Sequence, residues 1–232
     1  MSRKSKLQQF EENTNFGHVI QPTFEEAFNE DHVLKGNWKK SIFKNNNPIV
    51  LELGCGKGEY TVGLAERTLN KNFIGIDIKG ARIWRGAKLV GEKGLTNATF
   101  LRTKIDFLPN FFAPNEVDEI WLTFSDPQSK KPGKRLSSEP FLERYLQLLK
   151  PGGYIHLKTD SRLLYNSTMD VCNKLGLEVE THSHDIYQSD WDKLSAIEKK
   201  DLEIKTFYEK TWLDQGFRIN YCRFKLHDYR KK

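Results

Sequence analysis

A short apolar run followed by a glycine-rich loop is the first place in the sequence where residue types suggest chemistry. Ile49–Leu53 is typical of a buried parallel strand, and Gly54-Cys55-Gly56-Lys57-Gly58 follows it directly. Glycines in such a loop let the backbone approach a ligand, because they lack a side chain and tolerate positive φ. We therefore predict that Gly54 and Gly56 contact a nucleotide-like cofactor. Taken alone, Gly-x-Gly-x-Gly is also typical of dehydrogenases.

Two carboxylates narrow the class of cofactor. Glu52 lies inside the predicted strand, where a charge is costly unless it has a partner. Asp77 ends the next predicted strand, Phe73–Ile78, where a carboxylate can accept both hydroxyls of a ribose. A pyrophosphate would fit poorly beside Glu52, whereas S-adenosylmethionine carries no phosphate and two cationic groups. We predict that both residues bind this cofactor. The structural alternatives are a hydrogen bond from the loop backbone to Glu52, and a helix cap at Asp77.

A carboxylate and a basic loop follow the predicted fourth strand, 116–124. Asp126 stands in Phe124-Ser125-Asp126-Pro127-Gln128, at the end of a strand where substrates are commonly bound. Four cations then surround a Pro-Gly turn. In this position they could bind the phosphates of a nucleic acid, although the loop could also be simply solvated. The four are Lys130, Lys131, Lys134 and Arg135.

A further carboxylate, Asp160, ends the predicted fifth strand, 154–159. Asp126 and Asp160 could face one pocket and accept the N1–H and N2–H₂ donors of a guanine. Asp160 could instead cap the helix that follows it. Late in the chain, the segment Thr206-Phe207-Tyr208-Glu209 could add another acceptor, with a plain amphipathic helix as the alternative.

Strands and helices alternate from Ile49 onward, which predicts an α/β fold with a doubly wound, mostly parallel sheet of seven strands. The last two strands, 177–181 and 217–226, flank a charged insert and are expected to pair antiparallel. Residues 1–46 are polar and lack periodicity. We interpret them as an N-terminal extension whose first dozen or so residues could form a mobile tail, and 47–232 as the main domain.

Composition bears on the partner and the compartment. The net charge of +6 favours an anionic partner, although solvated lysines would give the same value. Three cysteines without ligand spacing, no signal peptide and no membrane-spanning apolar run favour a cytoplasmic protein. No metal site is expected, because His182-x-His184-Asp185 has no Cys or third His at ligand spacing. The sequence is compatible with a monomer or a homodimer.

The motifs, taken in order, resemble those of the bacterial tRNA (guanine-N7-)-methyltransferases from about Pro48 to Phe224. They read LELGCGKG (51–58), GIDIKG (75–80), FSDPQSKK (124–131), GGYIHLKTD (152–160) and TFYE (206–209). The resemblance implies the methyltransferase fold and 7-methylguanosine in tRNA as product, usually at position 46 of the variable loop. It implies cofactor contacts from Glu52, Asp77 and Asp126, and contacts with tRNA or guanine from Lys130, Asp160 and the segment 206–209.

Two positions depart from the family pattern. Gln128-Ser129 stands where the family usually has Trp-Pro, so an apolar contact of the substrate loop is absent. Lys104 stands where the family has an acidic residue near the adenine. Asp106 could substitute for it after a small shift, or the backbone at residues 104 and 105 could hold the adenine edge.

The expected chemistry needs no general base, because guanine N7 carries an in-plane lone pair and no proton. Asp126 is therefore predicted to act in catalysis by positioning and by stabilising the positive charge that moves onto the purine. One alternative is another S-adenosylmethionine-dependent enzyme that methylates amino groups of RNA or protein. A second is a non-catalytic tRNA-binding protein, and a nicotinamide dehydrogenase is the third.

Overall fold

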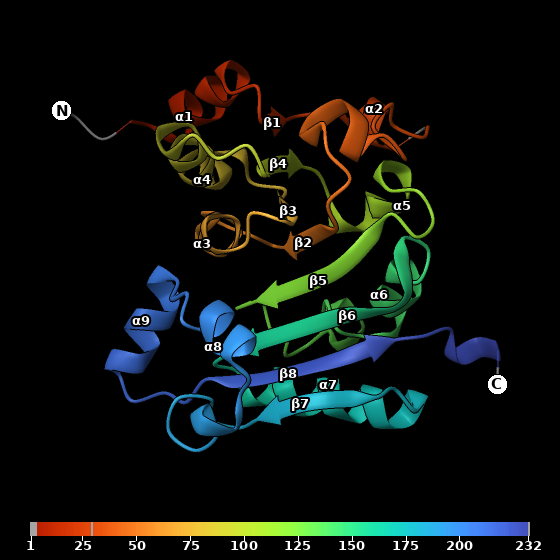
Figure 1. Ribbon diagram of the computed structural model, residues 1–232, viewed down its shortest axis with the longest axis vertical. Coiled ribbons are helices and arrows are strands. Elements are labelled where there is room, and N and C mark those ends of the chain that lie inside the picture. Colours follow the sequence, from red (N-terminus) through yellow and green to blue (C-terminus); the bar gives the residue numbers. More distant parts are fainter. Residues whose placement is uncertain (1–3, 29, 232) are drawn as a thin grey trace. The chain divides into compact units, whose positions relative to one another are not determined.

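The computed structural model describes residues 4–28 and 30–231, and residues 1–3 and 29 of the predicted extension lie outside this range. The chain divides into two compact units, with the boundary between Ala113 and Pro114. Each unit contains its own parallel strands and helices (Figure 1). The glycine-rich loop falls in the first unit, and the basic loop falls in the second.

The sheet of the first unit has four parallel strands in the order β1-β4-β3-β2. The apolar strands β2 and β3 are buried along their whole length, as expected of parallel strands covered on both faces. The register pairs Leu51 with Ile74 and Ile74 with Thr99. The strands are β1 (Val19–Ile20), β2 (Ile49–Leu53), β3 (Asn72–Asp77) and β4 (Ala98–Arg102).

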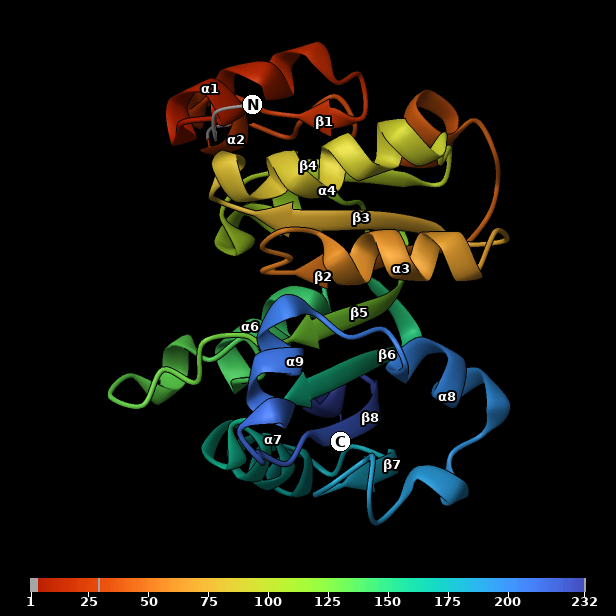
Figure 2. The same ribbon diagram turned by 90° about the vertical axis from the view of Figure 1, so that its left-hand side faces the viewer.

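Two helices, α3 (Glu59–Arg67) and α4 (Gly80–Lys93), pack side by side against this sheet (Figure 2). Gly94 ends α4 with a φ of 63°, and its N–H is directed at the carbonyls of Val90 and Gly91, the usual role of glycine after a helix. The remaining helical segments of this unit are α1 (Lys6–Glu12), α2 (Phe24–Phe28), α5 (Leu108–Phe111), the 3-10 helices Asn13–Asn15 and Ile105–Phe107, and the π-helix Trp38–Phe43.

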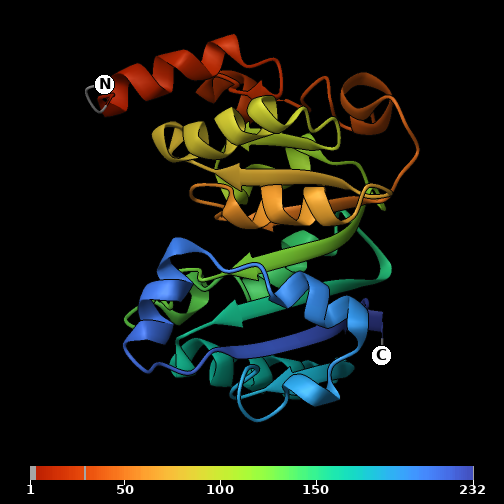
Figure 3. The same ribbon diagram turned by 60° about the vertical axis from the view of Figure 1, so that its left-hand side comes forward.

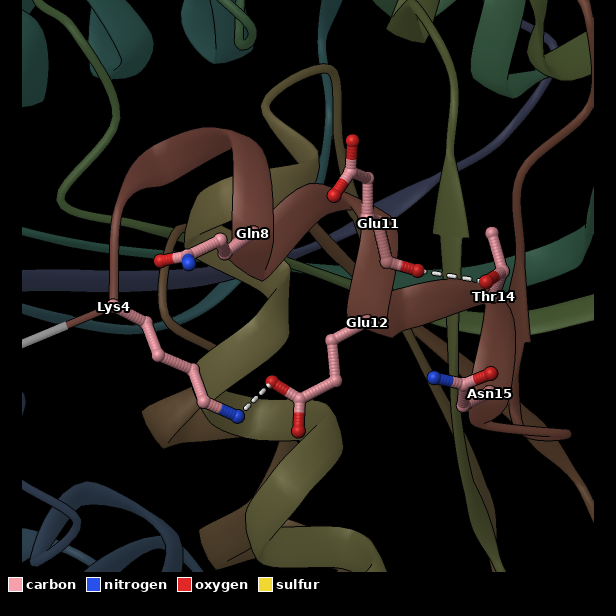
Figure 4. A pocket seen from close by; sticks show the side chains of 6 residues that line it. All are labelled: Lys4, Gln8, Glu11, Glu12, Thr14 and Asn15. Atoms are coloured by element: carbon pink, nitrogen blue, oxygen red, sulfur yellow. Dashed lines mark hydrogen bonds and ion pairs between the residues drawn. The ribbon is translucent and has the colours of Figure 1, made fainter.

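The N-terminal segment is fastened to α4. Asn13 is fully buried and its Nδ2 donates to the carbonyl of Gly80 at 2.8 Å. Glu12 accepts a hydrogen bond from Nε1 of Trp84 at 2.8 Å and pairs with Lys4. Figure 4 shows the six residues that line a pocket here, with the Lys4 side chain directed at Glu12 and the Thr14 hydroxyl at the Glu11 carbonyl. Residues 4–15 therefore pack on the first unit through specific polar contacts.

The second unit has strands in the order β5-β6-β8-β7. β5 and β6 are parallel, whereas β8 runs antiparallel to both of its neighbours, β6 and β7. α6 and α7 lie on one face of these strands and α8 lies on the other (Figures 1 and 2). The strands are β5 (Val117–Thr123), β6 (Leu149–Thr159), β7 (Val179–Ser183) and β8 (Asn220–Leu226). The helices are α6 (Glu139–Tyr145), α7 (Arg162–Leu175), α8 (Ala196–Leu202) and α9 (Phe207–Asp214), with 3-10 helices at Pro132–Lys134, Trp191–Lys193 and Tyr229–Lys231.

The predicted α/β class and the antiparallel last strand are confirmed, but the strand count is not. Eight strands occur among the described residues, and the strand not predicted is β1. Its two residues are too few to show a periodic pattern, yet they pair with Phe100 and Leu101 of β4. The predicted extension therefore contributes the edge strand of the first unit.

One helix boundary also differs from the prediction. The sequence alone predicts a helix over 138–149 that closes before Lys150-Pro151-Gly152-Gly153, but α6 ends at Tyr145 and β6 already begins at Leu149. Pro151 and Gly152 lie inside β6. A register irregularity opposite Val117–Glu119 accommodates them, because a bulge tolerates a missing donor and a positive φ within a strand.

Candidate functional site

The glycine-rich loop of the first unit crosses the end of β3. The backbone N–H groups of Gly54 and Cys55 both donate to the carbonyl of Ile76, at 2.8 and 3.0 Å. Gly54 and Gly56 have φ values of 75° and 55°, which residues with a Cβ rarely adopt. A Cβ built on Gly56 would meet nothing within 4 Å, so the loop leaves open space there. A ligand can approach the backbone at this point.

The loop rests on the ring of Phe100, a fully buried residue of β4. A Cβ on Gly58 would come within 2.6 Å of this ring, and so would a Cβ on Gly75 or Gly86. Real Cβ atoms do not approach other atoms this closely, so the ring occupies space that three glycines leave open. Phe100 thus sets how closely the loop, β3 and α4 can pack.

Glu52 is buried beneath the first turn of α3. Its Oε2 accepts hydrogen bonds from the backbone N–H of Thr61 at 2.8 Å and from the Thr61 hydroxyl. N–H groups in a first turn have no helical partner, and the positive end of the helix dipole favours a carboxylate. Thr61 belongs to the helix that follows the loop, so the Glu52 carboxylate links β2 to the start of α3.

Asp77 joins the glycine-rich loop to the start of α4. Oδ2 accepts from the N–H of Gly56 at 3.0 Å, and Oδ1 accepts from the N–H of Lys79 at 2.8 Å. A carboxylate oxygen has more than one acceptor position, so these bonds leave capacity for hydroxyl donors. Lys79 occupies the N-cap position of α4, so the capping alternative for Asp77 holds in part and is compatible with ligand binding.

Two side chains of the first unit, Lys104 and Cys55, have surroundings that argue against a chemical role in the cofactor site. Lys104 is exposed, and its ammonium lies 5.6 Å from the ring centre of Phe24 and 5.5 Å from that of Phe107. These are cation–π contacts. Burial, together with the carboxylates of Glu52 and Asp77, raises the pKa of the Cys55 thiol well above its ordinary value. The thiol therefore stays protonated and is no nucleophile.

Asp126 begins a strained turn in the second unit. It is exposed, and its Oδ1 accepts from the N–H of Gln128 at 2.9 Å. Phe124 and Gln128 on either side have φ values of 49° and 45°, in the left-handed region that side chains disfavour. Strain of this kind commonly occurs at functional sites, where surrounding contacts maintain it. The sequence gives no signal for this feature, because Gln is not a residue that favours positive φ.

The four cations of the basic loop have two different environments. Lys130, Lys131 and Lys134 are exposed. Arg135 is only 6% exposed, and its guanidinium donates to the carbonyl of Pro127 at 2.9 Å and to the hydroxyl of Ser167 at 2.7 Å. This arrangement corrects the prediction for Arg135, because a buried guanidinium bound to these partners supports the loop from within.

Asp160 follows β6 and is half-buried, and this burial raises the pKa of its carboxyl. The helix cap is the neighbouring residue, Ser161, whose hydroxyl accepts from the N–H of Leu164 at 3.2 Å. The capping alternative for Asp160 is therefore wrong. Its carboxylate remains a candidate acceptor for a substrate donor.

The segment Thr206–Glu209 separates into buried and exposed side chains. Thr206 caps α9, and its hydroxyl accepts from the N–H of Glu209 at 3.1 Å. Glu209 has no exposed surface and pairs with Lys158 at 2.8 Å. Phe207 and Tyr208 are 57% and 52% exposed and contact each other edge to face. The Glu209 side chain, predicted to contact RNA, is thus buried, whereas the two aromatic side chains are accessible.

Sequence reasoning missed Lys158 and its neighbour Tyr187. Lys158 stands in a run of strand residues with apolar neighbours and is fully buried. A lysine at such a position needs a buried partner, which was the available signal.

No helix in the described part of the chain is long and apolar enough to cross a membrane.

The chain matches the family described as "Putative methyltransferase" over residues 46–221. It is 49% identical to a tRNA (guanine-N(7)-)-methyltransferase of Christiangramia forsetii, over 97% of this chain and 100% of that one. It is 48% identical to a protein of the same name from Bacteroides fragilis, over 96% of this chain and 86% of the relative.

Solved structures show the fold. KamB, a 16S rRNA methyltransferase, gives a TM-score of 0.59 at 13% identity and covers 82% of this chain and 92% of its own. A 30S ribosomal A1408 methyltransferase from an uncultured bacterium gives 0.56 at 19% identity, over 80% of this chain and 90% of that one. The strands and helices described above are thus those of a methyltransferase fold.

Proposed function

The chain belongs to the family of tRNA (guanine-N(7)-)-methyltransferases, and we propose that it transfers a methyl group from S-adenosylmethionine to N7 of a guanine in the variable loop of tRNA. The observation that carries the proposal is the similarity over nearly the whole chain. A relative of this name is 49% identical over 97% of the chain, which includes the glycine-rich loop, the basic loop and the segment 206–209. Chance retention of the nucleotide-binding loop alone would not give such coverage.

The first unit fits S-adenosylmethionine through the chemistry of its donor set. The open backbone at Gly56 and the second acceptor positions of Asp77 suit an adenosine with its two ribose hydroxyls. Gly54 supplies the turn. Glu52 holds the loop by binding Thr61 of α3, and its charge favours a cationic ligand nearby. When bound, the cofactor supplies the methyl group as part of an electrophilic sulfonium.

Asp126 is proposed to act on the guanine. The lone pair of N7 attacks the methyl carbon, so no proton has to be removed in this step. The exposed carboxylate of Asp126, fixed by its bond with the N–H of Gln128, would align the purine and stabilise its developing positive charge. A contact of Asp126 with the cofactor, implied by family resemblance, is part of the same proposal.

The RNA is proposed to bind through two sets of side chains in the second unit. Lys130, Lys131 and Lys134 would bind phosphates because they are exposed cations. Asp160 would accept base donors, and Phe207 and Tyr208 offer exposed rings for stacking. Arg135, Thr206 and Glu209 would support these groups from within. We further propose that the protein works in the cytoplasm, where its free cysteines stay reduced, as a monomer or homodimer.

The direct test incubates the protein with labelled S-adenosylmethionine and unmodified bulk tRNA, followed by digestion and mass spectrometry of the nucleosides. Labelled 7-methylguanosine from the variable loop is the expected product. Labelled N6-methyladenosine would favour an amino-methyltransferase and overturn the proposal. If no nucleoside is labelled, titration with S-adenosylhomocysteine separates a non-catalytic tRNA-binding protein, which would not bind it, from an enzyme with another substrate.

A further inference from the structure

A fully buried ammonium lies in the middle of the sheet of the second unit. Lys158 belongs to β6 and pairs with Thr123 of β5 on one side and Tyr221 of β8 on the other. Its Nζ donates to the carbonyl oxygens of Leu202 at 2.8 Å and Ile204 at 3.0 Å, and it pairs with Glu209 at 2.8 Å. The three donors of the ammonium thus have three partners, as a buried charge requires.

Tyr187 completes the arrangement around Glu209. Its hydroxyl lies 2.5 Å from Oε1 of Glu209 and 2.9 Å from the carbonyl oxygen of Leu202. Burial and the carboxylate of Glu209 raise the pKa of Tyr187, so the hydroxyl stays protonated and donates a hydrogen bond to the carboxylate. We call Lys158, Glu209 and Tyr187 the buried triad.

The buried triad fixes the connection between α8 and α9. α8 ends at Leu202 and α9 begins at Phe207, and Lys158 binds carbonyls at positions 202 and 204 of this connection. Lys158 also binds the carboxylate of Glu209, which belongs to the first turn of α9. Figures 1 and 3 show α9 beside the carboxyl end of β6.

The residues proposed to contact RNA lie next to members of the buried triad in the chain. Phe207 and Tyr208 lie between the cap Thr206 and the buried Glu209, so the triad determines where their exposed rings stand. Asp160 follows Lys158 by two positions in the chain. The triad therefore connects the strand that Asp160 follows with the helix turn that carries the two rings.

Stability alone does not explain a charged triad at this place. Buried ion pairs commonly contribute no more to stability than apolar side chains of similar volume, because both charges must be desolvated. An ammonium with three directed bonds, however, fixes three groups in one geometry, whereas apolar packing permits sliding. Three directed bonds therefore favour a role in orientation.

We infer that the buried triad is a positioning device for the nucleic-acid substrate, in which Glu209 acts by holding the first turn of α9 against β6 and makes no contact with RNA. Lys158 and Tyr187 become positioning residues of the reaction. The inference rests on the proposed function for the identity of the substrate. Glu209 then matters because it fixes the position of α9, and not because it binds the RNA.

The test measures KM for tRNA, kcat, the Kd of S-adenosylhomocysteine and the Kd of tRNA for four variants. Tyr187→Phe and Glu209→Gln keep the shape of the triad and remove one directed bond or the charge. Lys158→Met together with Glu209→Met replaces the ion pair by apolar side chains. Lys193→Met is the matched control, because it removes an exposed ammonium, paired with Asp190, from the same insert.

We expect KM and Kd for tRNA to rise about tenfold in the three triad variants, with kcat within about threefold of wild type, as for a loss of substrate binding. The Kd of S-adenosylhomocysteine and all constants of Lys193→Met stay unchanged. Lys158→Met alone, a fifth variant used only for urea unfolding, should lose stability, and the double variant should recover most of that loss while its KM stays high. This split between stability and KM is what a positioning role requires.

Two results would overturn the inference. A double variant with wild-type KM and Kd for tRNA would show that the triad only stabilises the fold. A raised KM in Glu209→Gln with wild-type values in Tyr187→Phe would show that Glu209 contacts RNA directly. If the wild-type protein forms no 7-methylguanosine, the proposed function fails, and the Kd values for tRNA still decide the positioning role.

Discussion

The carboxylate of Asp77 accepts a hydrogen bond from the backbone N–H of Gly56, with 3.0 Å between the two atoms. One residue at the end of β3 thus fixes the glycine-rich loop and, through Lys79, the start of α4. The loop that would carry the cofactor is held by the same side chain that would bind its ribose.

Asp77→Ala should weaken binding of S-adenosylhomocysteine by about 10- to 100-fold, because hydrogen bonds to a charged group are lost together with the anchor of the loop. Isothermal titration measures the Kd directly. Asp31→Ala, which removes an exposed carboxylate paired with Lys35 in the same unit, is the control. Equal affinities of the two variants would exclude Asp77 from the cofactor site.

Gly58→Ala should destabilise the protein by about 2–3 kcal/mol, because the new methyl group meets the Phe100 ring and the backbone has positive φ. Gly94→Ala has a similar φ of 63° but open space around its Cβ, so it should cost only about 1 kcal/mol. Urea unfolding compares the two. If both variants lose the same stability, the ring of Phe100 does not limit the loop.

Asp126→Ala should lower kcat for tRNA methylation by about 100-fold, the loss typical of one electrostatic contact in the transition state. Asp126→Asn separates charge from shape, because its side-chain oxygen can still accept from Gln128 and hold the turn. We expect the Asn variant to keep tRNA affinity and to lose most of kcat. Wild-type turnover of Asp126→Ala with normal cofactor affinity would contradict the catalytic role.

Replacing Lys130, Lys131 and Lys134 by Gln should reduce the salt dependence of tRNA binding. Each phosphate contact contributes about 0.7–0.9 to the slope of log K against log salt, so three contacts lower it by about 2–3. Filter binding at several salt concentrations gives the slope. Arg135→Gln should instead lower the free energy of unfolding, since this guanidinium is buried. An unchanged slope in the triple variant would remove the basic loop from the RNA site.

The pH dependence of stability should reveal Asp160. Burial raises the pKa of its carboxyl above the ordinary value of about 3.9. The ordinary pKa applies to the unfolded chain and the raised pKa to the folded protein. At pH values between the two, the folded protein binds more protons than the unfolded chain, so Asp160 makes the free energy of unfolding fall as the pH rises. Asp160→Asn should therefore gain stability relative to wild type on going from below pH 4 to neutral pH. Urea unfolding at several pH values measures the difference, and a difference independent of pH would contradict it.

The glycine-rich loop and Asp77 could be predicted from the sequence because local patterns determine them. A continuous apolar run, a turn made of glycines and a carboxylate at a strand end need no knowledge of distant residues. β1 could not be predicted, because its two residues become a strand only by pairing with Phe100 and Leu101, far along the chain.

The burial of particular charged side chains could likewise not be predicted from the local sequence. Lys134 and Arg135 are neighbours in one loop, yet only Arg135 finds the Pro127 carbonyl and Ser167 hydroxyl that allow burial. Glu209 follows two exposed aromatic residues, and its burial depends on Lys158 and Tyr187 from other elements. The role of segment 206–209 at the RNA site stays a prediction, and the sequence does not distinguish its side chains that face solvent from those that support them.

The pairing of β1 with β4 has a consequence for shortened forms of the chain. The N–H of Phe100 is bound by the carbonyl of His18, so β4 is not the outermost strand of its sheet. A protein lacking the N-terminal segment would present β4 as a bare edge with unpaired backbone groups, which is a template for self-association through added strands. We therefore expect a shortened protein that begins after β1 to self-associate more readily than the full chain.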